Sequence, residues 1–153
     1  MSIKEGGEDV MPTCITFFSE GIHFRLANEE RTRQWILAVF RKYGKDAGEI
    51  NYIFCSDDYL LEMNQEYLDH DTYTDILTFD MTEEGENISA DIFVSIDRVR
   101  ENALTLAIDF EEELNRVIIH GILHLLGFDD KDEDSKLMMR QTEQTCLNIL
   151  KDK

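Results

Sequence analysis

The hydrophobic positions of the chain recur with two different periods, and these predict strands interleaved with helices. Short apolar runs rich in β-branched or aromatic residues predict strands at 14–19, 49–56, 75–81 and 88–96. The last two runs are joined by the acidic, turn-like segment 82–87, which suggests a hairpin-like pair. Segment 21–26 is predicted to be either a further short strand or a turn.

Longer amphipathic stretches with start and stop signals predict the helices. They cover 28–44, 56–68, 97–107, 109–127 and 135–151. Asn28 and Ser56 are suited to cap the first two helices, and Gly127 ends the fourth. The fourth helix is apolar on nearly all sides from Val117 to Leu126, so we expect it to be central and buried.

Together these elements predict an α+β fold in a single domain. We expect a small mixed sheet of about four strands, with four to five helices packed on it. Residues 12–153 would form this domain and residues 1–11 a flexible N-terminal tail, because regular patterns begin only after Met11. With 153 residues, 42% of them hydrophobic, the chain is long enough to bury a core.

Composition narrows the function. The chain has 15 basic and 33 acidic residues, a formal net charge of −18, which opposes long-range attraction to nucleic acid. Binding to RNA would then need a local basic patch, a metal or a docking partner. The N-terminus is polar and acidic, and no segment has the roughly 20 apolar residues of a membrane span, so we expect a cytoplasmic protein without a membrane partner. The three widely spaced cysteines are expected to be reduced thiols.

Candidate chemistry lies in the stretch HGILHLLGFDD at 120–130. His120 and His124 are one helical turn apart, so their imidazoles can direct lone pairs at one metal ion. Gly127 then turns the chain back, and Asp130 is suited to be the third ligand. Three neighbouring carboxylates stay open as alternatives: Asp129, Asp132 and Asp134. The competing interpretation is a pair of core histidines satisfied by hydrogen bonds.

Zinc proteases share this spacing, but Gly121 argues against a protease. In the protease motif the residue after the first histidine is a glutamate that serves as general base, and a glycine cannot take a proton. A glycine inside a helix also costs roughly 1 kcal/mol. We therefore expect that substrate or another element of the fold approaches the helix closely at Gly121.

The same stretch resembles the signature of the YbeY family of bacterial metal-dependent endoribonucleases, His-Gly-x-Leu-His-Leu-x-Gly-aromatic-Asp-His. It matches through Asp129, and Asp130 stands where the family usually has its third histidine. Two further segments resemble the family in the same order, MNQEYLDHDTYTDILTF at 63–79 and ADIFVSIDRV at 90–99. The resemblance covers most of the chain from about residue 50 onward.

The resemblance implies a single-strand-specific endoribonuclease with one divalent ion, expected to be Zn²⁺, at three ligands. It implies a role in maturing the 3′ end of small-subunit (16S) rRNA and in ribosome quality control. The partners would be single-stranded RNA and the ribosome or a ribosomal protein, and not DNA. In such a site the metal lowers the pKa of a water and polarises a phosphoryl oxygen. The rival hypothesis is a non-catalytic ribosome assembly factor whose metal is structural.

Two departures from the family bear on this site. Asp130 adds negative charge and makes a bound ion less electrophilic than a third imidazole would, and two histidines with one carboxylate also serve iron. Leu68 stands where the family has an arginine thought to contact the RNA phosphate. His70 or Arg116 could supply that positive charge.

Several other residues are candidates for supporting roles. Asn64 could support the active cleft, while Thr74 and Asp75 could cap or orient neighbours at the start of a strand. Asp91 is a candidate to hydrogen-bond a ligand imidazole, and the backbone around Gly121 to donate to the phosphate. Seven basic residues form either solvated helix faces or a positive groove beside the metal: Arg31, Arg33, Arg41, Lys42, Lys45, Arg98 and Arg100.

Overall fold

The computed structural model of the chain describes residues 14–68 and 74–152. The predicted N-terminal tail, 1–11, and the candidate His70 lie outside the described residues. None of the helices in the described ranges is both long enough and apolar enough to cross a membrane.

A four-stranded mixed sheet forms the centre of the fold. Its strands are β2 (Cys14–Glu20), β3 (Ala47–Cys55), β4 (Ile76–Asp80) and β5 (Ile88–Ser95), in the order β2-β3-β5-β4. β3 pairs in parallel with both β2 and β5, whereas β4 pairs with β5 antiparallel. The predicted mixed sheet and the hairpin-like pair are therefore confirmed, and segment 21–26 forms no strand.

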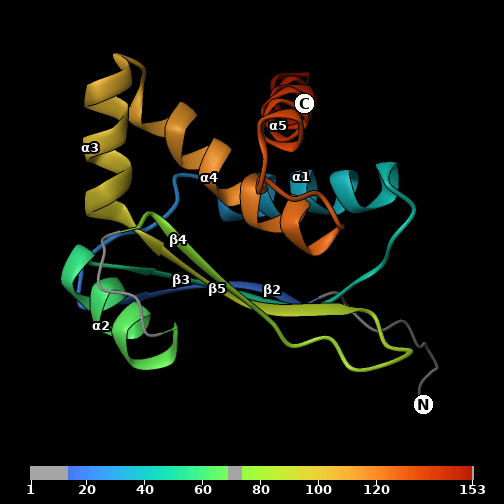
Figure 1. The fold of residues 1–153 in the computed structure, drawn as a ribbon, viewed down its shortest axis with the longest axis horizontal. Helices are drawn as coiled ribbons and strands as arrows, with labels where there is room; N and C mark the ends of the chain where they lie inside the picture. Colours follow the sequence, from blue (N-terminus) through green and yellow to red (C-terminus); the bar gives the residue numbers. More distant parts are fainter. Residues whose placement is uncertain (1–13, 69–73, 153) are drawn as a thin grey trace.

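Five helices surround this sheet on both of its faces. They are α1 (Glu29–Lys42), α2 (Asp57–Leu68), α3 (Ile96–Leu106), α4 (Phe110–Leu125) and α5 (Glu133–Lys151). Figure 1 shows α1, α3, α4 and α5 on one side and α2 alone on the other. The capping prediction holds for α1, whose N-cap Asn28 accepts a hydrogen bond from the Arg31 amide.

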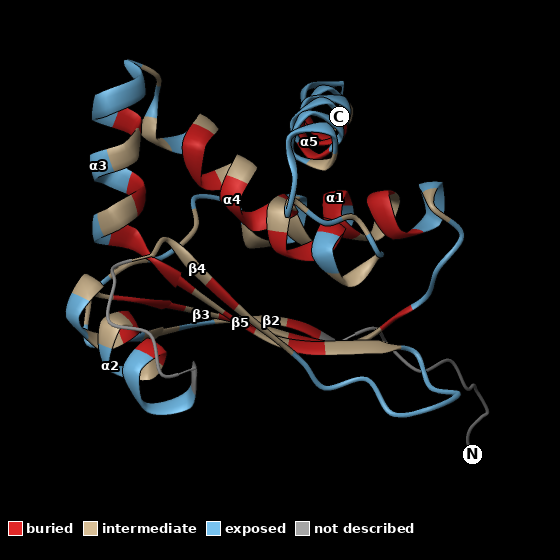
Figure 2. Ribbon diagram, in the orientation of Figure 1, coloured by how far each residue is buried: buried red, intermediate tan, exposed pale blue. Residues whose placement is uncertain are grey.

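The apolar residues divide into two clusters, one on each face of the sheet. The larger lies between the sheet and the four helices, and Figure 2 shows the buried sides of α1, α4 and α5 turned toward it. Two buried hydrogen bonds cross this core, from Trp35 Nε1 to the Cys146 carbonyl at 2.8 Å and from Tyr52 Oη to the Ile118 carbonyl at 2.7 Å. The smaller cluster is centred on Cys55, Leu60 and Leu77, under α2.

Helix α4 is the central helix, as its apolar sequence predicts. It rests directly on the sheet at Gly121, where an added Cβ would lie 3.1 Å from Ile76 Cδ1, 3.3 Å from Thr78 Oγ1 and 3.4 Å from Ile92 Cδ1. The close approach expected at Gly121 is therefore made by β4 and β5 of the fold itself. This contact holds the next turns of α4 beside the edge strand β4.

Candidate metal centre

Three side chains converge at the C-terminal end of α4. The ligating atoms of His120, His124 and Asp130 all lie within 4.8 Å of one another. His120 Nε2 is 3.6 Å from one carboxylate oxygen of Asp130, and His124 Nε2 is 3.7 Å from the other. Donors bound at 2.0–2.2 Å around a tetrahedral zinc ion are about 3.3–3.6 Å apart. The two histidine–aspartate separations are therefore close to those of a metal site.

The loop after α4 brings Asp130 to the histidines. Gly127, with φ of +105°, turns the chain back at the helix end. Its amide donates to the His124 carbonyl at 3.1 Å, and the amide of Phe128 donates to the Leu123 carbonyl at 3.0 Å. These bonds satisfy carbonyls that a helix end otherwise leaves without partners. The ring of Phe128 packs edge-on against Tyr43, which anchors the loop on α1.

The neighbouring aspartates are placed differently from Asp130. Asp132 is the N-cap of α5 and accepts a hydrogen bond from the Ser135 amide at 2.8 Å. The helix therefore begins at Glu133, two residues before the predicted start at 135. Asp134 lies in the first turn of that helix, and Asp129 accepts from the Lys131 amide at 3.4 Å. Of the four candidate carboxylates, the structure groups only Asp130 with both histidines.

The second ring nitrogen of His120 is held by Glu143, a residue that sequence reasoning missed. Its carboxylate oxygen lies 2.6 Å from His120 Nδ1, and its side chain is only 8% exposed. A carboxylate in this position accepts the Nδ1 proton and leaves Nε2 free to face a metal. The sequence holds one signal for this residue, its helical spacing. Glu143 lies on the same face of α5 as Met139, Cys146 and Leu150, and that face is buried in the core.

The pKa of His120 reflects this surrounding charge. Burial of the imidazole lowers its pKa, but the hydrogen bond that it donates to Glu143 and the negative charges of Glu143, Asp130 and Asp75 outweigh burial and raise the pKa overall. For the acidic Asp75 burial has the opposite effect and raises the pKa, although the charge of His120 lowers it. The site is strongly acidic without an ion, and such a site favours binding of a cation.

A cavity of about 510 Å³ opens beside the three converging residues. Its other walls come mainly from the start of β4 and include two predicted residues, Thr74 and Asp75. Asp75 accepts a hydrogen bond from Asn102 Nδ2 at 3.2 Å, and Thr74 Oγ1 bonds the Ile76 carbonyl at 3.4 Å. The structure thus brings the second sequence segment to the same place as the histidine stretch.

Arg116 lies beside the site but is engaged with carboxylates. Its guanidinium is 3.5 Å from Glu143, 3.8 Å from Glu113 and 4.0 Å from Glu112. It lines a smaller cavity that also contains His120 and Asp130. This arrangement makes Arg116 a partner of Glu143 rather than a free cation that faces a substrate.

Two predicted supporting residues are not brought to the histidines. Asp91 accepts a hydrogen bond from Asn51 Nδ2 at 3.0 Å and lines a different cavity. The expected contact between Asp91 and a ligand imidazole is therefore not formed. The reason is strand alternation: Ile92 contacts the α4 side of the sheet, which leaves Asp91 on the opposite side. Asn64 is buried in α2, the helix on that opposite side.

Of the two interpretations of the basic residues, the positive groove is not observed in the described part of the chain. None of the seven basic residues proposed for it lines either cavity at His120. Arg33 pairs with Glu30 and bonds the Ile15 carbonyl, Arg31 bonds the Leu150 carbonyl, and Arg98 pairs with Asp57.

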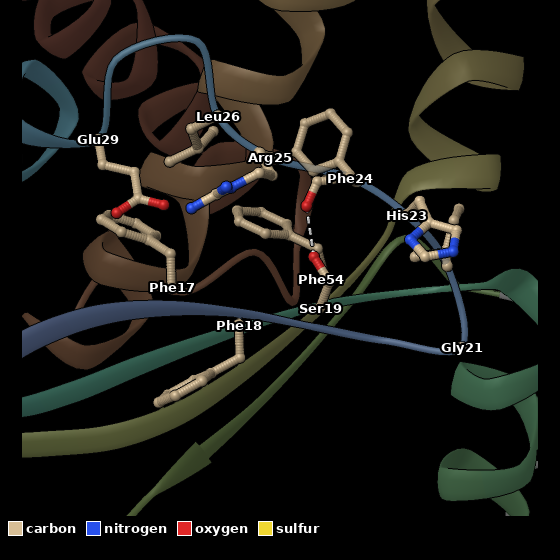
Figure 3. Close-up of a pocket in the computed structure, with 11 residues that line it drawn as sticks. Phe17, Phe18, Ser19, Gly21, His23, Phe24, Arg25, Leu26, Glu29 and Phe54 are labelled. Carbon is tan, nitrogen blue, oxygen red and sulfur yellow. Dashed lines mark hydrogen bonds between the residues drawn. The ribbon is translucent and has the colours of Figure 1, made fainter.

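A larger cavity, of about 770 Å³, lies along the other edge of the sheet. Figure 3 shows its aromatic side chains, among them Phe17, Phe24 and Phe54, together with Arg25 and His23. It contains one carboxylate, that of Glu29, and none of the residues predicted for the site. Size alone is therefore a poor guide here, and the chemistry is concentrated at the smaller cavities beside α4.

Comparison with known proteins decides the family. The family model described as "Endoribonuclease YbeY" matches residues 17–151. The chain belongs to the YbeY family. Curated relatives include the endoribonuclease YbeY of Parabacteroides distasonis, 49% identical over 90% of this chain and 96% of the relative, and that of Porphyromonas gingivalis W83, 46% identical over 90% and 91%. The solution structure of TM1509 from Thermotoga maritima is 30% identical, with a TM-score of 0.63, over 89% of this chain and 88% of that one.

The YbeY match agrees with the resemblance that the sequence motifs carry and extends it toward the N-terminus. It includes α1 and most of β2, which lie before the part of the chain that the motifs cover. The solved relative also supports the α+β architecture with its mixed sheet.

Proposed function

We propose that this YbeY protein is a single-strand-specific, metal-dependent endoribonuclease that matures the 3′ end of small-subunit (16S) rRNA and acts in ribosome quality control. The observation that carries the proposal is the convergence of His120, His124 and Asp130 beside an open cavity. Membership in a family of endoribonucleases supports RNA as the substrate. The proposed setting is the cytoplasm, with the ribosome or a ribosomal protein as partner and with neither DNA nor a membrane as target.

The donor set fits a divalent metal ion, and Zn²⁺ is the ion we propose. Two imidazoles and a carboxylate form a known catalytic zinc set, and three protein ligands leave a position for water or substrate. When bound, such an ion would lower the pKa of a water and polarise a phosphoryl oxygen of the RNA. Structural zinc sites are normally closed by four protein ligands, so an open three-residue group favours catalysis over a purely structural role.

The protein's own residues prepare this chemistry. Glu143 fixes the His120 ring by its 2.6 Å contact, and Arg116 in turn balances the buried charge of Glu143. Gly121 allows α4 to lie against β4, so that the histidines face the cavity wall formed by Thr74 and Asp75. Gly121 carries no carboxylate, which leaves the site without the general base of a zinc protease.

The proposal is tested by comparing the wild type with His124→Ala. Bound zinc would be measured by mass spectrometry of the native protein, and cleavage would be followed on a single-stranded RNA and on DNA of the same sequence. We expect metal-dependent cleavage of RNA alone, with both zinc and cleavage lost in the variant. Cleavage that persists unchanged in His124→Ala would refute the enzyme assignment.

The rival proposal, a non-catalytic assembly factor with a structural metal, is favoured by the acidic cavity. It predicts a zinc-loaded wild type that binds ribosomes but leaves RNA intact with every metal tried. The third ligand is tested separately with Asp130→Ala against Asp129→Ala, a matched change at an exposed neighbour. Only the first should lower zinc affinity, and equal affinities would assign the third ligand elsewhere.

A further inference from the structure

The smaller cavity beside His120 contains more negative than positive side chains. This cavity, of about 280 Å³, is lined by the carboxylates of Asp75, Glu113, Asp130 and Glu143 and by the guanidiniums of Arg116 and Arg140. A divalent ion at the site would bring the formal charge of these groups to neutrality. A phosphodiester that enters would make the sum negative again. Its binding therefore depends on a positively charged side chain that is not already paired with a carboxylate.

Arg116 is not such a side chain, because it is already paired with carboxylates. It is within 4.0 Å of three carboxylates, those of Glu112, Glu113 and Glu143, and its side chain is only 20% exposed. To contact RNA it would have to leave the ion pair with Glu143 and so remove the support of His120.

Among the described residues, Arg140 differs from Arg116 both in its exposure and in its lack of a carboxylate partner. It lies on the exposed side of α5, and within the described part of the chain its guanidinium has neither an ion pair nor a hydrogen bond. It lies one helical turn before Glu143 and lines the same cavity as His120 and Asp130. Its charge is close enough to act on the buried carboxylate of Glu113.

We propose that Arg140 binds a phosphate of the RNA beside the metal centre, an inference that rests on the function proposed above. A guanidinium presents several N–H donors in a planar fork that matches phosphate oxygens. Because Arg140 is exposed and unpaired, it can reach a phosphate without breaking an existing contact. It would supply a local positive charge in a protein whose overall charge of −18 otherwise repels RNA.

The test compares Arg140→Gln with Arg41→Gln, which removes the same charge at an exposed position of α1 away from the cavity. Two measurements are made on the zinc-loaded protein, each at several salt concentrations. The first gives KM and kcat on a single-stranded RNA, and the second gives the Kd for a labelled, cleavage-resistant analogue of that RNA. We expect kcat/KM to fall and Kd to rise at least about tenfold in Arg140→Gln, the low end for a lost bond to a charged group. The slope of log Kd against log salt should fall by about 0.7, the contribution of one phosphate contact on a single strand.

Arg140→Lys keeps the charge and should restore most of the salt slope. Zinc content should be unchanged in all three variants, because Arg140 contacts no ligand. Equal kinetics, Kd and salt slope in Arg140→Gln and Arg41→Gln would overturn the role of Arg140 and leave the proposed function intact. Zinc loss in Arg140→Gln would also overturn it, since the residue would then act on the metal centre. A wild type that neither binds nor cuts RNA would refute the proposed function and this inference together.

Discussion

Glu143 gives the most direct test of how the proposed metal centre is built. We consider Glu143→Gln, which keeps the shape of the side chain but removes its charge. Glutamine can still meet His120 Nδ1 through its oxygen, but it is a weaker acceptor and its amide can equally favour the wrong tautomer of the ring. The proposed metal site should therefore lose affinity while the fold is retained.

The magnitude follows from the contact. Loss of such a partner of a metal-ligating histidine costs about 10- to 100-fold in metal affinity, which corresponds to about 1.4–2.8 kcal/mol. The contact is short, at 2.6 Å, and the two side chains are only 8% and 21% exposed. Because solvent screens this pair little, we expect an effect in the upper half of that range.

The assay is competition for zinc between the protein and a chromophoric chelator, with Glu112→Gln as the control. Glu112 is 43% exposed and 4.0 Å from Arg116, so the control removes the same charge from the same cluster without touching His120. If Glu143→Gln binds zinc as tightly as Glu112→Gln, then Glu143 does not hold the ligand and this reasoning is wrong.

Three further predictions concern the frame around the site. Tyr52→Phe should lower the free energy of unfolding by about 1 kcal/mol, because it deletes the buried hydrogen bond to the Ile118 carbonyl. The control Tyr67→Phe, at a residue that is 60% exposed, should leave the free energy of unfolding unchanged. Equal effects of the two changes would show that the Tyr52 hydrogen bond does not stabilise the fold. Gly127→Ala should cost about 1–2 kcal/mol in thermal unfolding, because φ there is +105°; an unchanged melting temperature would contradict this. Burial raises the pKa of Cys55 from 9.0 to about 12, so its neutral thiol contributes stability that is complete below pH 9 and is lost as pH rises toward 12. Between about pH 9.5 and 11, wild-type stability should therefore fall about 1.4 kcal/mol per pH unit more steeply than that of Cys55→Ala, and parallel curves would exclude the raised pKa.

The parts of the site that could be predicted from sequence are those that depend on local geometry. The spacing of His120 and His124 places them on one face of a helix, and Gly127 marks where that helix must end. Both are short-range consequences of backbone geometry, and the structure shows both. The strand and helix order could be predicted for the same reason, because periodicity and capping act within a few residues.

The parts that could not be predicted depend on tertiary packing. Glu143 lies on a different helix from His120, and only the packing of α5 against α4 brings them together. The motif does not say which face of β5 meets α4, so it leaves Asp91 as a candidate to contact a ligand imidazole. The contact of Ile92 with Gly121 decides the face and places Asp91 on the other one. The sequence predicts helices packed on the sheet but not which face each one covers, and α2 covers the face opposite to the other four.

The acidic character of the site links metal binding to RNA binding. Asp75, Asp130 and Glu143 lie around His120, and the hydrogen bond to Glu143 together with these three charges raises the His120 pKa against the effect of burial. The same charges would attract a divalent ion and repel a phosphodiester in its absence. Metal and RNA should therefore bind cooperatively, each raising the affinity for the other by the same factor. This coupling reconciles a net charge of −18 with an RNA substrate, because the ion and Arg140 would offset the repulsion only where the substrate is to be cut.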